Sequence, residues 1–262
     1  MSAERGGDVL KLLLVVCPPY RNVEGLLRVA EIVRDALNGS IAALCVRSEI
    51  AQKYYSPFSI QLGKVDKEEE KKIFEDITRV LGNDVVKLSR GGELVSQVLD
   101  EIEKGNYDML IYADVDSKLT KKLAEYSHVT TLIYRRGERL SSFLVCTDGS
   151  EHSLRAAEFA ARLAAPMGAT LALLSVARSE EERPRAEEAV KRAREAIAGI
   201  YSGEVEDKVE VGGVRETILR EGRHHDLLAL APRGLSKIER VVLGHISLHV
   251  LEKAESNVLL VR

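Results

Sequence analysis

The chain has 262 residues, a length that suits two compact domains of about 130 residues, each large enough to bury its own core. Its 38 basic and 41 acidic side chains give a net charge of −3, which excludes the basic footprint of a nucleic-acid-binding protein. The N-terminus shows no signal peptide, and the apolar run 11–17 is too short to span a membrane. We therefore expect a cytoplasmic protein without membrane contact.

Short apolar runs alternate with helical spacing along the first half of the chain. Strands are predicted at 12–16, 40–46, 84–88, 109–112 and 129–134, and helices at 23–37, 68–81, 93–103 and 118–126. The run 12–16 is continuously apolar, which is typical of a strand buried on both faces. This alternation predicts a parallel sheet covered by helices on both sides.

The second half repeats the same order after a polar linker at 135–139. Strands are predicted at 142–146, 170–176, 209–211, 227–230 and 258–261, and helices at 153–164, 184–200, 215–221 and 246–253. We therefore predict an α/β protein with two tandem domains, at 1–136 and 140–262. Each is expected to hold an open, mostly parallel five-stranded sheet with helices on both faces.

The two halves also match by residue. The segment 28–31 corresponds to 155–158, and the glycine pair 91–92 corresponds to 212–213. Asp108 precedes the fourth strand of the first half as Asp226 does in the second, and Ala113 follows that strand as Ala231 does. These matches indicate an internal repeat, so two copies of one fold are expected.

The repeat breaks in the loop after the fourth strand. Only 22 positions separate Ala113 from Arg135, whereas 31 separate Ala231 from Arg262, so the first half is shorter by nine. Its loop, residues 114–117, carries two aspartates and no glycine. Such a loop disfavours phosphate, so we predict that the first half is a degenerate copy without a nucleotide site.

The second-half loop carries a pattern of its own. Ala231, Gly234, Gly244 and His245 stand at the spacing of a glycine, two residues, a glycine, nine residues, a glycine and then Ser or Thr. With the strand end at Asp148 and the closing strand 258–261, this pattern resembles the universal stress protein family. The resemblance covers 142–262 and, more faintly, 11–136, and it implies a Rossmann-like fold of the adenine nucleotide alpha hydrolase type.

The resemblance also implies a ligand site, because one branch of the family binds ATP. It implies that Asp148 lies by the base or sugar, that Val176 lies against the adenine, and that the glycine loop wraps the phosphates, with Mg²⁺ as the accompanying ion. Arg233 lies beside the loop and would add charge. The candidate ligand-binding residues are Thr147, Asp148, Val176, Arg233, Gly234, Gly244, His245, Ile246 and Ser247.

Two positions depart from the family pattern. A methyl group at Ala231 restricts positive φ and close approach, and Pro232 removes a backbone donor. At His245 a ring replaces a small hydroxyl group. Two functions therefore stay open: a non-enzymatic protein that binds ATP or another adenine nucleotide as a regulatory ligand, and a ligand-free protein-interaction module of the same fold.

Other residues have simpler interpretations. Asp148, with Gly149 and Ser150, also fits a turn that caps a helix. His224 and His225 fit a solvated turn, and His245 and His249 a helix surface, so no metal site is expected. The three separated cysteines fit reduced core thiols.

The sequence offers little for catalysis and more for assembly. It shows neither a Ser/His/Asp set nor a P-loop, so we expect no catalytic residues and a slow ATPase at most. The last strand of each half, 129–134 and 258–261, needs a cover for its edge. We expect the two to pair within one chain as a pseudo-dimer, with a homodimer left open and the protein partner unknown.

Overall fold

The computed structural model describes residues 9–16, 23–47, 67–232 and 243–262. Its elements follow the predicted alternation closely, because strands buried on both faces are apolar throughout while helices show one apolar face. Val86, in an exposed strand, and Val9 and Tyr126 are the large hydrophobic side chains exposed among these residues.

The first half contains five strands and the helices that connect them. Its elements are β1 (Lys11–Val15), α1 (Val23–Ala36), β2 (Ser40–Arg47), α3 (Lys67–Leu81), β3 (Val86–Gly91), α4 (Leu94–Gly105), β4 (Met109–Ala113), α5 (Ser117–Tyr126) and β5 (Thr130–Tyr134).

The second half repeats this order. Its elements are β6 (Ser142–Cys146), α6 (Glu151–Met167), β7 (Thr170–Ala177), the short 3-10 helix η1 (Glu180–Glu182), α7 (Arg183–Ile197), β8 (Val205–Val211), α8 (Val214–Gly222), β9 (Leu227–Leu230), α9 (His245–Lys253) and β10 (Asn257–Leu260). Sequence reasoning found the strand at β8 only in its last three residues, because its other residues are mostly charged and half exposed.

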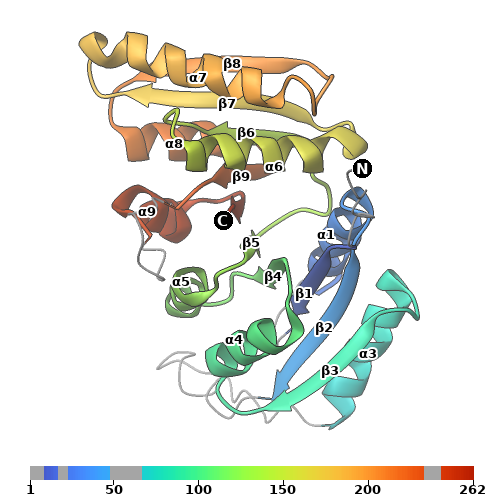
Figure 1. Ribbon diagram of the computed structural model, residues 1–262. Coiled ribbons are helices and arrows are strands. Elements are labelled where there is room, and N and C mark those ends of the chain that lie inside the picture. The colour runs from blue at the N-terminus through green and yellow to red at the C-terminus, as the bar shows by residue number, and fades with distance from the viewer. Residues whose placement is uncertain (1–8, 17–22, 48–66, 233–242) are drawn as a thin grey trace, which may run out of the picture.

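The strands form one sheet in the order β3-β2-β1-β4-β5-β10-β9-β6-β7-β8 (Figure 1). Within each half all pairings are parallel. The last strands of the two halves, β5 and β10, pair antiparallel, with Leu259 opposite Leu132. The two five-stranded sheets expected from the sequence are therefore the two halves of a single ten-stranded sheet.

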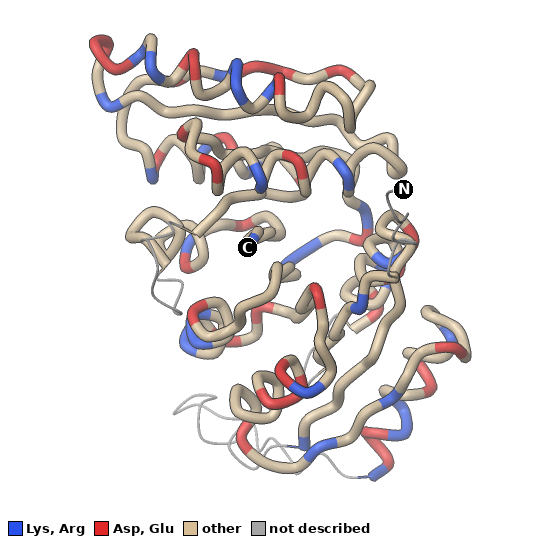
Figure 2. The backbone as a smooth tube through the Cα atoms, viewed as in Figure 1, with Lys and Arg blue, Asp and Glu red and all other residues tan. Residues whose placement is uncertain are grey.

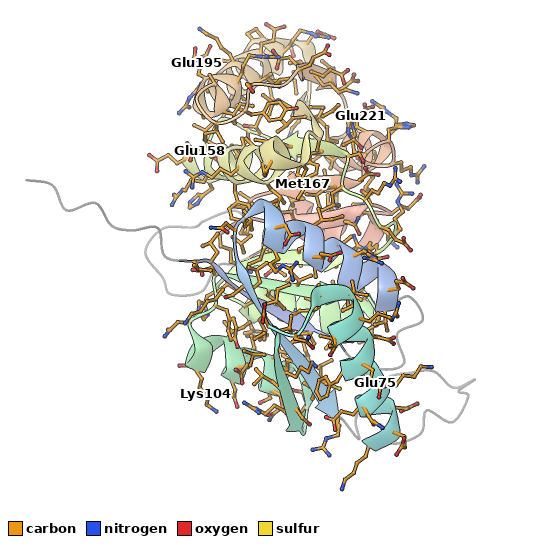
Figure 3. The ribbon with its side chains drawn as sticks, turned by 90° about the vertical axis from the view of Figure 1, so that its right-hand side faces the viewer. Glu75, Lys104, Glu158, Met167, Glu195 and Glu221 are labelled. Atoms are coloured by element: carbon orange, nitrogen blue, oxygen red, sulfur yellow. The ribbon has the colours of Figure 1, made fainter. Side chains whose placement is uncertain are left out.

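Two apolar cores lie on opposite faces of this sheet. One contains buried side chains from α1, α3, α6 and α7, and the other contains those from α4, α5, α8 and α9. Strands twist by roughly 20° from one to the next, so ten strands accumulate about half a turn. Accordingly, Glu195 of α7 and Glu75 of α3 lie on opposite sides of the view in Figure 3, although their helices share one face.

The two halves touch through helices as well as strands. Helices α5 and α9 contact each other on one face, and α1 contacts α6 on the other (Figure 1). Charged residues of both signs line α3 and α7, while the central strands are uncharged (Figure 2). Among the described residues, no helix is both long and apolar enough to cross a membrane.

The internal repeat extends to hydrogen bonds. The Asp108 carboxylate accepts the backbone N–H of Lys11 at 2.8 Å, and the Asp226 carboxylate accepts that of Ser142 at 3.1 Å. Each aspartate thus ties the start of the fourth strand of its half to the start of the first. These matched roles are the structural reason for the sequence match between the two aspartates.

The glycine turns before α4 and α8 correspond as well. Gly92 and Gly212 have φ values of +129° and +147°, and each donates its N–H to the last residue of the neighbouring strand, Arg47 and Ala177. The glycine match is therefore Gly92 with Gly212, shifted by one residue from the pairing of 91–92 with 212–213. Both glycines form tight strand-to-helix turns, as the sequence indicated.

Candidate functional site

The candidate site lies where the strand order of the second half reverses. Its strands run β8-β7-β6-β9-β10, so the chain passes outward from β6 through β7 to β8 and then returns to β9 on the other side of β6. In open α/β sheets a crevice forms outside the carboxyl ends of the strands at this switch point. Here β6, β7 and β9 end at Cys146, Ala177 and Leu230, and the chain after β9 leads to α9.

The segment after β6 forms a tight turn and a helix cap. The Asp148 carboxylate accepts the N–H of Ser150 at 3.0 Å, and the Ser150 hydroxyl accepts the N–H of Ser153 at 3.3 Å at the start of α6. The Thr147 hydroxyl is buried and lies 3.1 Å from that of Ser153. The simpler reading of this segment as a turn and cap is therefore correct, although the Asp148 side chain remains exposed.

Gly149 makes this turn possible. Its φ is +75°, and a Cβ atom at this position would lie 3.2 Å from Ala189 of α7. Glycine is therefore needed here for two reasons: it adopts the left-handed backbone conformation without strain, and it leaves room for α7 to pack closely against the turn.

Helix α9 begins on the other side of the switch point. Gly244 is its N-cap, with an extended backbone (φ −67°, ψ 159°) and no side-chain cap. The His245 side chain is exposed and Ile246 is half buried. Ser247 is buried, and its hydroxyl donates to the carbonyl of Ala231 at 3.4 Å. The Ser247 hydroxyl is thus engaged within the protein, which leaves its backbone N–H as the group it offers to a ligand.

The N-terminus of α9 differs electrostatically from those of the other described helices. Each of the others has an acidic residue at its N-cap or in its first turn. Helix α9 has none. Its first-turn N–H groups and its helix dipole therefore meet no negative side chain from the helix itself, as is usual where a helix receives an anion.

The equivalent helix of the first half, α5, shows the opposite arrangement. Its N-cap is Asp116, whose carboxylate accepts the N–H groups of Lys118 and Leu119, both at 2.9 Å. A side-chain anion thus occupies the place where a ligand anion would bind. This arrangement gives a physical basis for the expectation that the first half lacks a nucleotide site.

Further protein groups bond to one another near the first-half switch point. The buried ring of Tyr112 donates its hydroxyl to the carbonyl of Thr120 at 3.1 Å. The Asp114 carboxylate accepts the Thr120 hydroxyl at 2.6 Å and the Arg135 guanidinium at 2.8 Å. Protein groups therefore satisfy one another at this point.

The second-half switch point has an apolar side. Cys146, Val176 and Ile246 are all partly buried and pack against the same apolar core, the one that contains α8 and α9. Burial raises the pKa of the Cys146 thiol to about 12, so this cysteine is a neutral apolar group at neutral pH. Val176 and Ile246, predicted from separate segments, are thus brought to one face of the sheet.

The structure describes both departures from the family pattern. Among the described non-glycine residues only Asn38 and Asn106 have positive φ, so Ala231 takes an ordinary backbone conformation. The His245 ring is exposed at the first position of α9. The predicted contacts Arg233 and Gly234 lie outside the described residues.

The histidines form no metal cluster within the described residues. In His225 the Nδ1 atom is buried and has no hydrogen-bond partner there. Burial lowers the pKa of His225, and the nearby charge of Lys208 lowers it further. His225 is therefore held in its neutral form, and the solvated turn expected at this position is partly buried.

Comparison with known proteins identifies the fold. The model of the universal stress protein family matches residues 141–262, and no curated protein matches the chain. A universal stress protein from Archaeoglobus fulgidus DSM 4304 is similar at 17% identity and a TM-score of 0.65, covering 96% of this chain and 98% of that one. A Pseudomonas aeruginosa PAO1 protein of unknown function is similar at 17% identity and 0.67, covering 97% and 92%. The predicted α/β fold with a mostly parallel sheet is confirmed.

Proposed function

Residues 141–262 are a universal stress protein domain, and on that basis we propose that this domain binds an adenine nucleotide, ATP with Mg²⁺ first, as a regulatory ligand. One observation carries the proposal. Helix α9 begins at the switch point and is the described helix without an acidic residue at its N-cap or in its first turn. A phosphate group would supply there the negative charge that Asp116 supplies at α5.

Different residues of the site would contact the phosphates, the base and the sugar. The N–H groups of His245, Ile246 and Ser247 would hold phosphate oxygens, because the first N–H groups of a helix have no acceptor within it. Val176 presents apolar surface for the base, and the exposed Asp148 carboxylate is suited to the hydroxyl groups of the sugar. The bound nucleotide contributes its triphosphate charge, and Mg²⁺ would offset part of it.

Several side chains of the site support a binding role rather than a catalytic one. The Ser247 hydroxyl is bonded to the Ala231 carbonyl, and the Cys146 thiol is neutral because of its raised pKa. The Asp148 carboxylate is engaged in the turn with Ser150. A nucleophile or general base needs a free group aimed at the reacting atom, and the Ser247 hydroxyl and the Cys146 thiol do not meet this need.

The test uses the protein as it is purified. Heat denaturation of freshly purified protein, followed by mass spectrometry of the released small molecules, should detect an adenine nucleotide in amounts comparable to the protein. Protein stripped of ligand should bind ATP with Mg²⁺ again. Absence of nucleotide in the first measurement, together with no binding at millimolar ATP, would show the proposal to be wrong.

A second candidate is an interaction module of the same fold that has lost its ligand. It is favoured by the internal bonds of Ser247 and Asp148, two predicted ligand contacts. In that case the double variant Ala231→Gly/His245→Ser should bind ATP while the native chain does not. Binding by the native chain would exclude this second function.

A further inference from the structure

Arg135, directly after β5 in the first half, reaches across to the second half. Its guanidinium donates to the carbonyl of Leu251 in the last turn of α9 and to that of Ser256 at 3.4 Å. Its Nε atom donates to the Asp114 carboxylate at 2.8 Å. The side chains of Arg135 and Asp114 are only 10% and 21% exposed, so this link is largely shielded from solvent.

A second arginine makes the matching contact in the opposite direction. Arg262, after β10, donates to the carbonyl of Ala124 in the last turn of α5. The two acceptors are equivalent, because the C-cap N–H of each helix bonds to the preceding carbonyl, Val250 in α9 and Leu123 in α5. Each half thus satisfies a free carbonyl at the helix C-terminus of the other half.

The two links differ in one respect. Asp114 anchors Arg135, but the position in the second half that corresponds to Asp114 is Pro232, which has no carboxylate. The Nε atom of Arg262 is buried without a partner among the described residues, and burial lowers the pKa of its guanidinium. The charged anchor therefore serves the link that holds α9, the helix of the candidate site.

We propose that Asp114 and Arg135 of the first half position helix α9 and thereby set the nucleotide affinity of the second half. This inference rests on the function proposed above. Helix α9 has only nine residues, from His245 to Lys253, so a link at Leu251 fixes the whole segment. Arg135 holds its C-terminal turn, and the bond from Ser247 to Ala231 holds its N-terminal turn.

In this proposal the first half positions the ligand helix of the second half. The loop after β4, residues 114–117, carries no glycine, and Asp114 there accepts Arg135 and the Thr120 hydroxyl in place of a ligand contact. Cations at a helix C-terminus stabilise the helix dipole, so Arg135 also favours α9 electrostatically. The first half is therefore a brace for the ligand helix of the second.

The test compares Arg135→Ala with its symmetry-related control, Arg262→Ala. Both variants remove an arginine that bonds a helix C-terminus across the interface, but only the first acts on α9. Hydrogen exchange of nucleotide-free protein should show faster exchange in α9 for Arg135→Ala, and in α5 for Arg262→Ala. ATP affinity should fall about tenfold for Arg135→Ala and less than about twofold for Arg262→Ala.

Hydrogen exchange tests the positioning of α9, and ATP affinity also tests the nucleotide binding proposed above. If the native chain binds no nucleotide, the function fails and the exchange data alone decide about the brace. If exchange in α9 is the same in both variants, or if both lose equal affinity, the brace is refuted. Should Arg135→Ala fail to fold, Asp114→Asn keeps the shape of the anchor and removes its charge. It should speed exchange in α9, and unchanged exchange in α9 would refute the brace.

Discussion

Replacing Gly244 with aspartate should stabilise helix α9 and weaken ligand binding there. In α5 the N-cap Asp116 accepts two backbone N–H groups at 2.9 Å, whereas the N-cap Gly244 of α9 accepts none through a side chain. The backbone of Gly244 is extended (φ −67°, ψ 159°), a conformation that aspartate adopts without strain. The substitution therefore transfers the cap of the first half to the second.

The expected size follows from two contributions. An aspartate N-cap improves on glycine by a few tenths of a kcal/mol. A negative charge at a helix N-terminus adds about 0.3–1 kcal/mol. The sum, about 1 kcal/mol, corresponds to a rise in Tm of roughly 2–4 °C for a chain of this size. The same carboxylate would occupy the phosphate position, so ATP affinity should fall by about tenfold or more.

Calorimetry measures both effects. Scanning calorimetry without nucleotide should show the higher Tm of Gly244→Asp, and titration with ATP and Mg²⁺ should show the loss of affinity. Gly244→Asn is the matched control, because it caps the helix without adding charge and should lose less affinity. If Gly244→Asp binds ATP as tightly as the native chain, phosphate does not bind at this helix and the reasoning fails.

Three further changes test the packing around the site. Gly149→Ala should destabilise the fold by about 2 kcal/mol, about 1 kcal/mol more than Gly168→Ala. Both glycines have positive φ, but only at Gly149 would the added Cβ lie as close as 3.2 Å to another residue, Ala189. Equal losses of stability in urea unfolding would contradict this. His225 has a lowered pKa, so the folded state binds fewer protons than the unfolded state, and stability should fall as pH drops below about 6.5. In His225→Gln the free energy of unfolding should depend less on pH in this range. An unchanged pH dependence would count against a role of His225. Asn257→Ala should cost about 3 kcal/mol, because the buried Asn257 amide bonds four backbone groups, three of them in the linker; a loss below about 1 kcal/mol would refute this role.

The fold was largely predictable because its strands are buried on both faces. The run around Leu13 is apolar throughout, and β1, β6 and β9 lie within about one residue of their predicted bounds. At the edge of the sheet this signal fails. In β8 the side chains of Glu206 and Asp207 face solvent, so hydrophobicity indicated only the end of the strand, near Val211.

The site was less predictable, because its geometry depends on contacts between distant segments. The sequence placed Val176 and Ile246 at the ligand site, and the structure brings both to one apolar core. It did not reveal that Arg135 and Arg262 each bond a helix of the other half. Their acceptors are backbone carbonyls, which no residue type marks, and the only signal was the matched position of the two arginines in the repeat.

The contrast between the capped helix α5 and the uncapped helix α9 is the center of the proposed function. Amide NMR spectra of the native chain, recorded during titration with ATP and Mg²⁺, test it directly. The signals of His245, Ile246 and Ser247 should shift, while those of Lys118 and Leu119, which Asp116 caps, stay in place. Unmoved signals from His245 to Ser247 at millimolar ATP would contradict nucleotide binding at this helix.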